Sequence, residues 1–181
     1  MLIRDAETND LPQILAIYNE VIATSTAVYS TVPVTLAERA EWFEQRRGGG
    51  LPVIIATEGD AILGFSSFGP FRGAWSGYRY SVEHSVHVRA DRRGGGIGRR
   101  LVEALFPLAA AQGKHVMIGA VDAANEGSLR FHERMGFERV AEFKEVGHKF
   151  GRWLDLVFLQ RFLDAPGSAR QGASRPITPG A

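Results

Sequence analysis

The feature that most constrains this chain is a glycine-rich turn, RRGGG at residues 92–96, that leads directly into an amphipathic helix. Apolar residues then recur at helical spacing from Ile97 to Leu108, and Gly113 stands where a helix would end. A helix that begins at such a turn exposes unpaired backbone N–H groups and the positive end of its dipole. The segment therefore predicts an anion-binding site.

The same five letters occur at residues 46–50, but there they close a helix. Thr35 and Glu38 have the spacing of a capping box, and basic residues at 46–47 suit the C-terminal end of a helix dipole. The run LPVIIAT that follows is short and rich in β-branched residues, as in a buried strand. We therefore expect only the second copy to bind phosphate.

Two common phosphate motifs are absent from this turn. A P-loop requires Lys-Ser or Lys-Thr after its glycines, and a dinucleotide fingerprint requires G-x-G-x-x-G, but neither register fits here. The pattern that fits is Arg93-x-x-Gly96-x-Gly98 directly before the helix. Glycines without Cβ atoms let successive N–H groups approach a diphosphate closely.

Periodicity predicts the element order strand, helix, helix, three strands, helix, strand, helix and two strands. Glu58-Gly59-Asp60 marks a hairpin, and one strand–helix–strand crossover spans about residues 81–121. The fold class is thus mixed α/β, with a largely antiparallel first half. We expect one domain over residues 1–163 and a disordered tail over 164–181, where Pro, Gly and Ser dominate.

Composition excludes several classes of protein. With 181 residues and 45% hydrophobic content the chain can bury one substantial core, and its net charge of +1 argues against a nucleic-acid partner. The absence of cysteine excludes disulfides, and the five histidines show no metal-ligand spacing. No signal segment or membrane-spanning run is evident, so we expect a soluble, cytoplasmic protein without a metal or a membrane partner.

The Arg93-x-x-Gly96-x-Gly98 turn after a V-x-V strand resembles motif A of the GCN5-related N-acetyltransferases (GNAT superfamily), which holds the pyrophosphate of acetyl-CoA. NEGSLRFHERMGF resembles their second signature, in which an Asn opens a helix ending in Gly-Phe. The resemblance implies the GNAT fold, a mixed and mostly antiparallel twisted sheet flanked by helices. Acetyl-CoA is expected where strands of this sheet splay apart, beside the glycine turn. It implies cofactor contacts from Val86, His87, Val88, Arg93, Gly94, Gly95, Gly96, Ile97, Gly98, Arg99, Asn125 and Ser128. Asn125 has the ordinary alternative of a helix N-cap, and Ser128 that of a first-turn polar residue.

A narrower resemblance joins segments outside the cofactor site. IYNEVIATSTAVYSTVPVTLAERAEWF, FGPFR, YRYSVEHSVHVRADRRGGGIG and GHKFGRWLDLVFLQ are together similar to the phosphinothricin and methionine sulfoximine N-acetyltransferases. The similarity runs from Ile3 to about Leu163. It implies a homodimer that acetylates the α-amino group of a small amino acid such as phosphinothricin, methionine sulfoximine or methionine sulfone.

Glu83 is the predicted general base. An ammonium group has no lone pair, so acetyl transfer requires a base that removes a proton, directly or through water. Glu83 lies in an otherwise apolar strand, where loss of hydration raises the pKa of a carboxyl. The resemblance also places a glutamate here, in contact with the substrate. The alternative is an exposed glutamate on a half-solvated sheet face.

His132 is the second catalytic candidate. Many GNAT enzymes have a tyrosine in this slot whose hydroxyl protonates the departing thiolate, whereas FHERMGF carries His132 there. Imidazole can perform the same proton transfer. Because a CoA thiolate can also leave unprotonated, a structural or substrate-contact role stands as the alternative.

An amino-acid substrate also brings a carboxylate, for which Arg is the fork-shaped partner. Arg72 lies in the aromatic loop GPFRGAWSGYRY and is the candidate, with Tyr78 and Tyr80 as pocket walls. Tyr29 is a substrate candidate by resemblance. The alternative for Arg72 is a solvated loop cation. Acetylation of a protein amine and acyl-CoA sensing without turnover are the rival functions.

Overall fold

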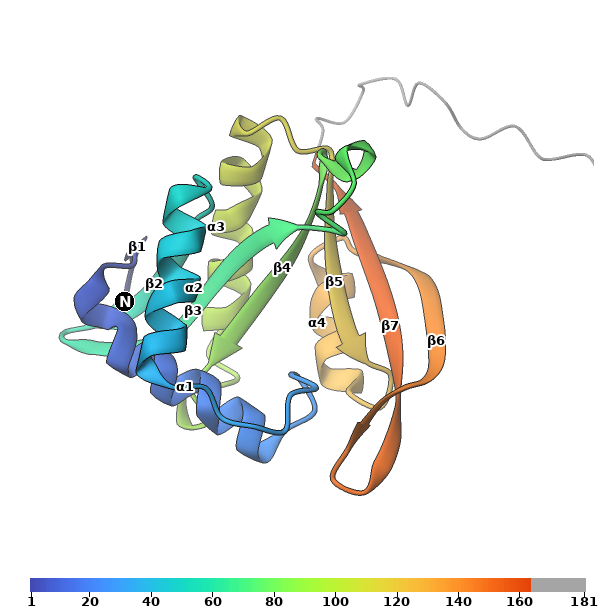
Figure 1. The fold of residues 1–181 in the computed structure, drawn as a ribbon, viewed down its shortest axis with the longest axis horizontal. Coiled ribbons are helices and arrows are strands. Elements are labelled where there is room, and N and C mark those ends of the chain that lie inside the picture. Colours follow the sequence, from blue (N-terminus) through green and yellow to red (C-terminus); the bar gives the residue numbers. More distant parts are fainter. Residues whose placement is uncertain (164–181) are drawn as a thin grey trace, which may run out of the picture.

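The computed structural model describes residues 1–163 of the chain (Figure 1). Its helices and strands follow the predicted order: β1 (Leu2–Asp5), α1 (Leu11–Thr24), α2 (Leu36–Gly48), β2 (Val53–Glu58), β3 (Ala61–Pro70), β4 (Ser81–Val88), α3 (Ile97–Ala111), β5 (Val116–Asp122), α4 (Glu126–Arg134), β6 (Glu138–Lys149) and β7 (Arg152–Phe162). Short 3-10 turns precede α1, β4 and α3. The segment 164–181, predicted to be a disordered tail, lies outside the described residues.

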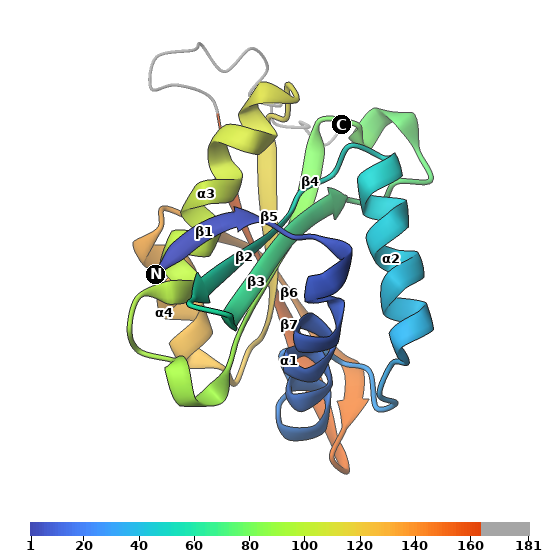
Figure 2. The ribbon, with the colours of Figure 1, turned by 90° about the vertical axis from the view of Figure 1, so that its left-hand side faces the viewer.

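The strands of residues 1–163 form one sheet in the order β1-β2-β3-β4-β5-β7-β6. Its neighbouring strands are antiparallel except β4 and β5, which run parallel. Helices α1 and α2 lie on one face of the sheet, and α3 and α4 lie on the other (Figure 2). The predicted mixed, mostly antiparallel α/β sheet is confirmed.

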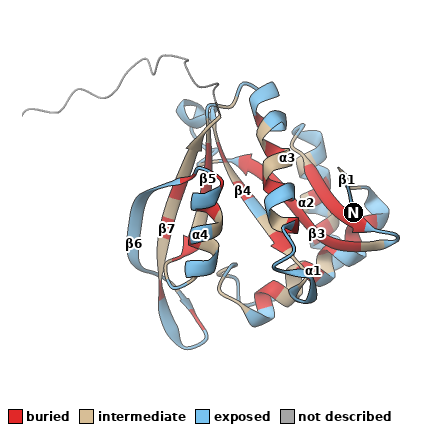
Figure 3. Cartoon of the chain, turned by 180° about the vertical axis from the view of Figure 1, so that it is seen from behind, coloured by how far each residue is buried: buried red, intermediate tan, exposed pale blue. Residues whose placement is uncertain are grey.

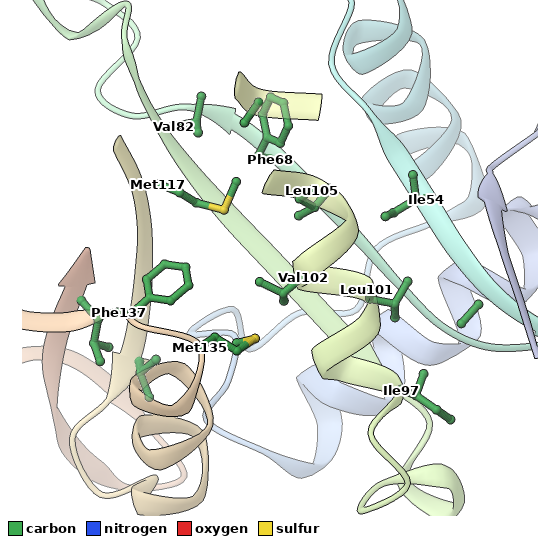
Figure 4. Close-up of a cluster of buried hydrophobic side chains, with 14 of the residues drawn as sticks. Ile54, Phe68, Val82, Ile97, Leu101, Val102, Leu105, Met117, Met135 and Phe137 are labelled. Carbon is green, nitrogen blue, oxygen red and sulfur yellow. The ribbon is translucent and has the colours of Figure 1, made fainter. Parts of the chain in front are cut away.

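The two faces of the sheet carry separate apolar cores. On the α3 side, Leu101, Val102 and Leu105 pack against Phe68, Val82 and Met117 of the strands (Figure 4). On the α1 and α2 side, apolar residues of both helices pack against Val53, Ile55, Ile62 and Phe65. Strand β2 contributes to both cores, which explains its unbroken apolar run, since a strand buried on both faces needs no alternation.

The helix ends follow the predicted signals, with one exception on the apolar face of α3. The Thr35 hydroxyl accepts from the Glu38 N–H at 3.2 Å, and the Thr35 N–H donates to Glu38 Oε2 at 2.6 Å, so the capping box opens α2. Helix α3 ends before Gly113, which has a φ of +67°. Leu108, predicted to lie on the apolar face of α3, is exposed, and Ala109 takes the buried position.

Strands β4 and β5 separate after a short shared stretch. They pair only from Ser81↔Val116 to Glu83↔Ile118. Beyond Glu83, β4 continues to Val88 with a strand partner on its β3 side alone, while β5 continues along β7. The two strands therefore diverge and leave an opening in the middle of the sheet (Figure 1).

Candidate active site

A cavity of about 500 Å³ lies where β4 and β5 diverge. Residues 83–87 of β4 and 119–122 of β5 form its two strand walls. Residues 26–29, which follow α1, border it on one side together with side chains of α2. Asn125, Ser128 and His132 of α4 border it as well. The opening in the sheet is thus surrounded by polar side chains from both strands, from α1, α2 and α4, and from the segment after α1.

Glu83 lies on the wall of this cavity, at the last position where β4 pairs with β5. Across the β3–β4 ladder it faces Gly69. The side chain is half-buried, and among residues 1–163 no cation lies within ion-pair distance of it. Burial raises the pKa of the Glu83 carboxyl above its ordinary value of 4.5. A carboxylate with a raised pKa is a stronger base than an exposed one.

His132 is buried in α4, and its geometry determines which ring nitrogen carries the proton. Its Nδ1 lies 2.7 Å from the carbonyl oxygen of Ser128. Since a carbonyl can only accept, Nδ1 carries the hydrogen and Nε2 keeps a lone pair. Burial lowers the pKa of His132, although the hydrogen bond to Ser128 opposes the shift. The neutral ring therefore presents an acceptor, not a donor, at Nε2.

A second imidazole lies beside His132. The ring of His84 on β4 is 5.1 Å from that of His132, centroid to centroid, and neither of its nitrogens has a hydrogen-bond partner among residues 1–163. A Cβ added at Gly119 of β5 would lie 3.0 Å from His132 Nε2 and 3.1 Å from His84 Nε2. Burial, with smaller effects of His132 and His87, lowers the pKa of His84 to about 3. Only glycine at position 119 leaves room for both neutral rings.

Asn125 and Ser128 form the first turn of α4. Asn125 Oδ1 accepts from the Ser128 N–H at 3.0 Å, which is an N-cap bond. The Asn125 side chain thus has the ordinary capping role, and both residues also line the cavity. Of the other predicted cofactor contacts, Val86 and His87 line it too.

The glycine turn lies at the end of β4, outside the cavity lining. Gly94 and Gly96 have φ values of +85° and +77°, a conformation that favours glycine, and Ile97 begins α3 directly afterwards. Arg93 Nε donates to the Val88 carbonyl oxygen at 3.1 Å, whereas Arg99 pairs with Glu103 at 2.7 Å. The turn therefore presents the open N-terminus of a fifteen-residue helix, flanked by arginines. The predicted cofactor contacts Val88, Gly95 and Gly98 lie in the same segment.

Two arginines of α2 border the cavity, and the sequence interpretation missed both. Arg39 is only 5% exposed, and its guanidinium carbon lies 3.9 Å from the ring centre of Tyr18. Arg46 is half-buried and donates to the Phe68 carbonyl oxygen at 2.7 Å. Arg46 was predicted only as a helix-end cation. The available signal was the spacing of Arg39, Trp42 and Arg46, which places them on one helix face.

The predicted substrate residues fall into two groups. Tyr29 lines the cavity and donates its hydroxyl to the Asp155 carbonyl oxygen at 3.1 Å; burial, followed by the charges of Asp122 and Asp155, raises its pKa to about 12. Arg72, Tyr78 and Tyr80 lie in the exposed loop between β3 and β4 and do not line the cavity of this chain. The Arg72 guanidinium carbon lies 5.0 Å from the Trp75 ring centre.

The segment at residues 25–29 is held against the β5 and β6 region by buried polar contacts. Lys149 Nζ donates to the carbonyl oxygens of Ser25 and Val28 at 2.8 and 2.7 Å. The Thr26 hydroxyl donates to the buried carboxylate of Asp122. These bonds fix one wall of the cavity, and no local sequence pattern indicated them.

Residues 1–163 hold no cluster of three or more His, Cys, Asp or Glu side chains suited to a metal ion. No helix in this part of the chain is long and apolar enough to cross a membrane.

The divergence of β4 and β5 and the open N-terminus of α3 match the features expected of an acyl-CoA-dependent acyltransferase. Residues 14–137 match the model of the acetyltransferase (GNAT) family, and the chain belongs to this family. It is therefore an N-acetyltransferase, and the rival interpretation as an acyl-CoA sensor without turnover is set aside. Enzymes of this family use acetyl-CoA.

Individual relatives are similar over most of their length. The chain is 47% identical over 168 residues to the L-methionine sulfoximine/L-methionine sulfone acetyltransferase of Pseudomonas paraeruginosa, covering 92% of this chain and 97% of the relative. A GNAT phosphinothricin acetyltransferase of Sinorhizobium meliloti, solved with acetyl-CoA, is 36% identical with a TM-score of 0.85, covering 89% of this chain and 87% of that one. A ribosomal-protein-alanine N-acetyltransferase of Brucella melitensis is 42% identical with a TM-score of 0.87, covering 90% and 99%.

Proposed function

We propose that this enzyme transfers the acetyl group of acetyl-CoA to the α-amino group of a small amino acid or analogue, such as methionine sulfoximine, methionine sulfone or phosphinothricin. Two relatives carry names with these substrates. The observation that carries the proposal is the placement of Glu83, a half-buried carboxyl with a raised pKa, in the wall of the cavity between β4 and β5.

The residues present suit acetyl-CoA, which supplies the acetyl group as a thioester. The glycine turn at residues 94–98 and the arginines Arg93 and Arg99 offer N–H groups and positive charge to phosphates. The backbone of β4 from residue 86 to 88 lacks a strand partner on the β5 side, so it can bond amide groups of the cofactor arm. Asn125 and Ser128 border the same opening.

Glu83 performs the proton removal that the reaction needs. Its carboxylate accepts a proton from the substrate ammonium, directly or through water, and leaves a lone pair on nitrogen. The amine then attacks the thioester carbonyl carbon and a C–N bond forms. The nitrogen releases its second proton to solvent, the C–S bond breaks and the thiolate leaves. Catalysis by direct transfer needs no covalent intermediate on the protein.

His132 has a more limited part than a tyrosine hydroxyl would have. With Nδ1–H committed to Ser128, the neutral ring has no hydrogen at Nε2 to give to a thiolate. It can donate there only after it has first accepted a proton. We therefore propose that His132 accepts and relays a proton in the cavity, and the thiolate leaves without direct protonation by a neutral His132.

We also propose that the enzyme is a cytoplasmic homodimer. Phe143 of β6, Phe150 of the turn that follows and Trp153 of β7 are exposed. Most of β6 is coloured as exposed in Figure 3, and burying exposed aromatic side chains is a frequent basis of subunit association. The loop with Arg72, Tyr78 and Tyr80 keeps its predicted substrate role in this assembly. Sedimentation analysis of the protein with Trp153→Asp, which should be monomeric, tests the dimer.

Acetylation of a protein amine is the second candidate, which the name of the Brucella melitensis relative favours. One assay separates the two. CoA release is followed with a thiol reagent for methionine sulfoximine, methionine sulfone, phosphinothricin, ordinary amino acids, a Lys peptide and a peptide with N-terminal alanine. Saturable turnover on the small analogues that is greatly reduced in Glu83→Gln supports the proposal. Turnover confined to the peptides would overturn it.

A further inference from the structure

Helix α2 presents two guanidinium groups to the cavity. Arg39, Trp42 and Arg46 line it, and their spacing puts them on one face of the helix. Seven residues of helix separate the arginines by roughly 10 Å along the axis. Elsewhere on α2, Phe43 packs into the core, and the exposed Arg47 pairs with Glu44.

Arg39 is a buried cation without an anionic partner. Its guanidinium lies over the rings of Tyr18 and Trp42 at 3.9 and 4.6 Å, and its Nε has no hydrogen-bond partner in the described part of the chain. Within residues 1–163 no carboxylate comes within ion-pair distance of it. Burial of an unpaired charge is unfavourable unless a ligand completes the pair.

Arg46 lies beside the proposed base. Its guanidinium occupies the space next to Gly69 that a side chain there would fill, and Gly69 faces Glu83 across the ladder. Phe68 supplies its single acceptor among the described residues, so most of its N–H donors remain free. Arg46 and Glu83 also share a second, smaller cavity of about 280 Å³ with Gly69 and Pro70.

We infer that these two arginines recognise the polar groups of the acceptor: Arg46 binds its α-carboxylate, and Arg39 binds oxygen atoms at the end of its side chain. The inference rests on the proposed function. In an α-amino acid the amine and the carboxylate share one carbon, so a substrate amine at Glu83 brings its carboxylate close to the base. Arg46 is the cavity-lining cation next to Glu83, and it offsets the repulsion between these two carboxylates.

The position of Arg39 defines the preferred acceptor class. Arg39 lines the same cavity, roughly 10 Å from Arg46 along the axis of α2, so an acceptor held at Arg46 needs an extended side chain of several bonds to reach it. A sulfone, sulfoximine or phosphinate end presents the oxygen acceptors that a guanidinium binds. An apolar end of the same length leaves the buried guanidinium unpaired and is disfavoured.

The proposed contact between Arg46 and the α-carboxylate is tested with two acceptors. One is methionine sulfone, and the other is its neutral carboxamide, methionine sulfone amide. We expect Arg46→Gln to lower kcat/KM for the acid by roughly 100-fold and for the amide by less than about 3-fold. Arg46→Lys should recover part of the loss. Arg47→Gln, an exposed neighbour paired with Glu44, is the matched control and should change neither value. An equal loss of kcat/KM for the acid and the amide in Arg46→Gln would overturn the inference. So would a preference for the acid over the amide that Arg72→Gln removes and Arg46→Gln retains.

The proposed contact between Arg39 and the side-chain oxygens is tested by comparing methionine sulfone with methionine, which differ only in those oxygens. We expect the wild type to prefer the sulfone and Arg39→Gln to lose roughly 10-fold or more of that preference. The melting temperature and the acetyl-CoA KM identify a variant that has merely lost its fold, and Arg39→Lys then takes its place. An unchanged preference in a folded variant contradicts the assignment.

Binding separates this inference from the proposed function. Phosphinothricin is titrated calorimetrically into the CoA-saturated wild type, Arg46→Gln and Arg47→Gln. Binding that is lost only in Arg46→Gln supports the inference even if no amino acid is acetylated, which would by itself refute the proposed function. Equal binding by all three proteins, or no binding to the wild type, refutes the inference.

Discussion

His132 Nδ1 donates to the carbonyl oxygen of Ser128, one turn earlier in α4, at 2.7 Å. Replacement by asparagine keeps an N–H group at the place of Nδ1 and removes Nε2. We expect His132→Asn to stay within about 1 kcal/mol of the wild-type unfolding free energy, because the helix bond persists. Its kcat should fall roughly 100-fold if Nε2 relays a proton. A wild-type kcat in a folded His132→Asn would show that the residue is structural.

The raised pKa of Glu83 has opposite consequences for activity and stability. Because the base must be ionised, the acidic limb of kcat/KM should titrate above pH 4.5, the ordinary value for glutamate. A folded-state pKa above the unfolded one favours the protonated form, so the carboxyl destabilises the fold progressively as pH rises above 4.5. At pH 7 Glu83→Gln should therefore be as stable as the wild type or more so, yet almost inactive.

The matched control for Glu83 is Glu41→Gln, an exposed carboxyl of α2 on which neither effect should appear. The pH–rate profile and thermal melts at pH 5 and pH 7 check both parts. A Glu83→Gln variant that is less stable than the wild type at pH 7 would contradict the claim that burial destabilises the ionised Glu83 carboxyl.

Gly96 begins α3 with a φ of +77°, which a residue with a Cβ adopts at a cost of roughly 1–2 kcal/mol. We expect Gly96→Ala to lower the melting temperature and to weaken acetyl-CoA binding, since it distorts the open N-terminus of the helix. Gly113, which follows the other end of α3 with a φ of +67° and no atom within 4 Å of an added Cβ, gives the control Gly113→Ala. Equal acetyl-CoA affinities of the two variants, measured by calorimetry, would contradict the role of the turn.

Gly69 provides the space for the Arg46 guanidinium. An added methyl group in Gly69→Ala should displace Arg46 from the Phe68 carbonyl, cost about 1–2 kcal/mol and raise the KM for the amino-acid acceptor. Gly48→Ala, at the end of α2 with no atom within 4 Å of the added Cβ, is the control. Chemical denaturation and acceptor kinetics of both variants provide the check, and an unchanged acceptor KM in Gly69→Ala would be the contrary result.

The fold could be predicted from the sequence because its signals are local. Hydrophobic periodicity located the helices and strands, the Thr35 and Glu38 pair opened α2, and glycines at 113 and 136 followed α3 and α4. Glu83 and His132 could be chosen for the same reason, since each lies in a recognisable segment. Their chemical roles stay predictions.

The parts that could not be predicted depend on how the elements dock. Arg46 resembles any cation at a helix end until α2 packs against β3 and directs its side chain toward Gly69. The contact of His84 with His132 joins β4 to α4, and the bonds of Lys149 to Ser25 and Val28 join residues more than 120 positions apart. Such contacts leave no local pattern in the sequence.

The most direct test of the account is the position of the acetyl group in the product. Methionine sulfone is incubated with the enzyme and acetyl-CoA labelled with ¹³C in the acetyl carbonyl, and the product is analysed by NMR and mass spectrometry. We predict a single new amide carbonyl coupled to the α-proton through the α-nitrogen, at a rate that Glu83→Gln greatly reduces. A label that remains in acetyl-CoA with every amino acid, and moves only to a peptide amine, would contradict the account.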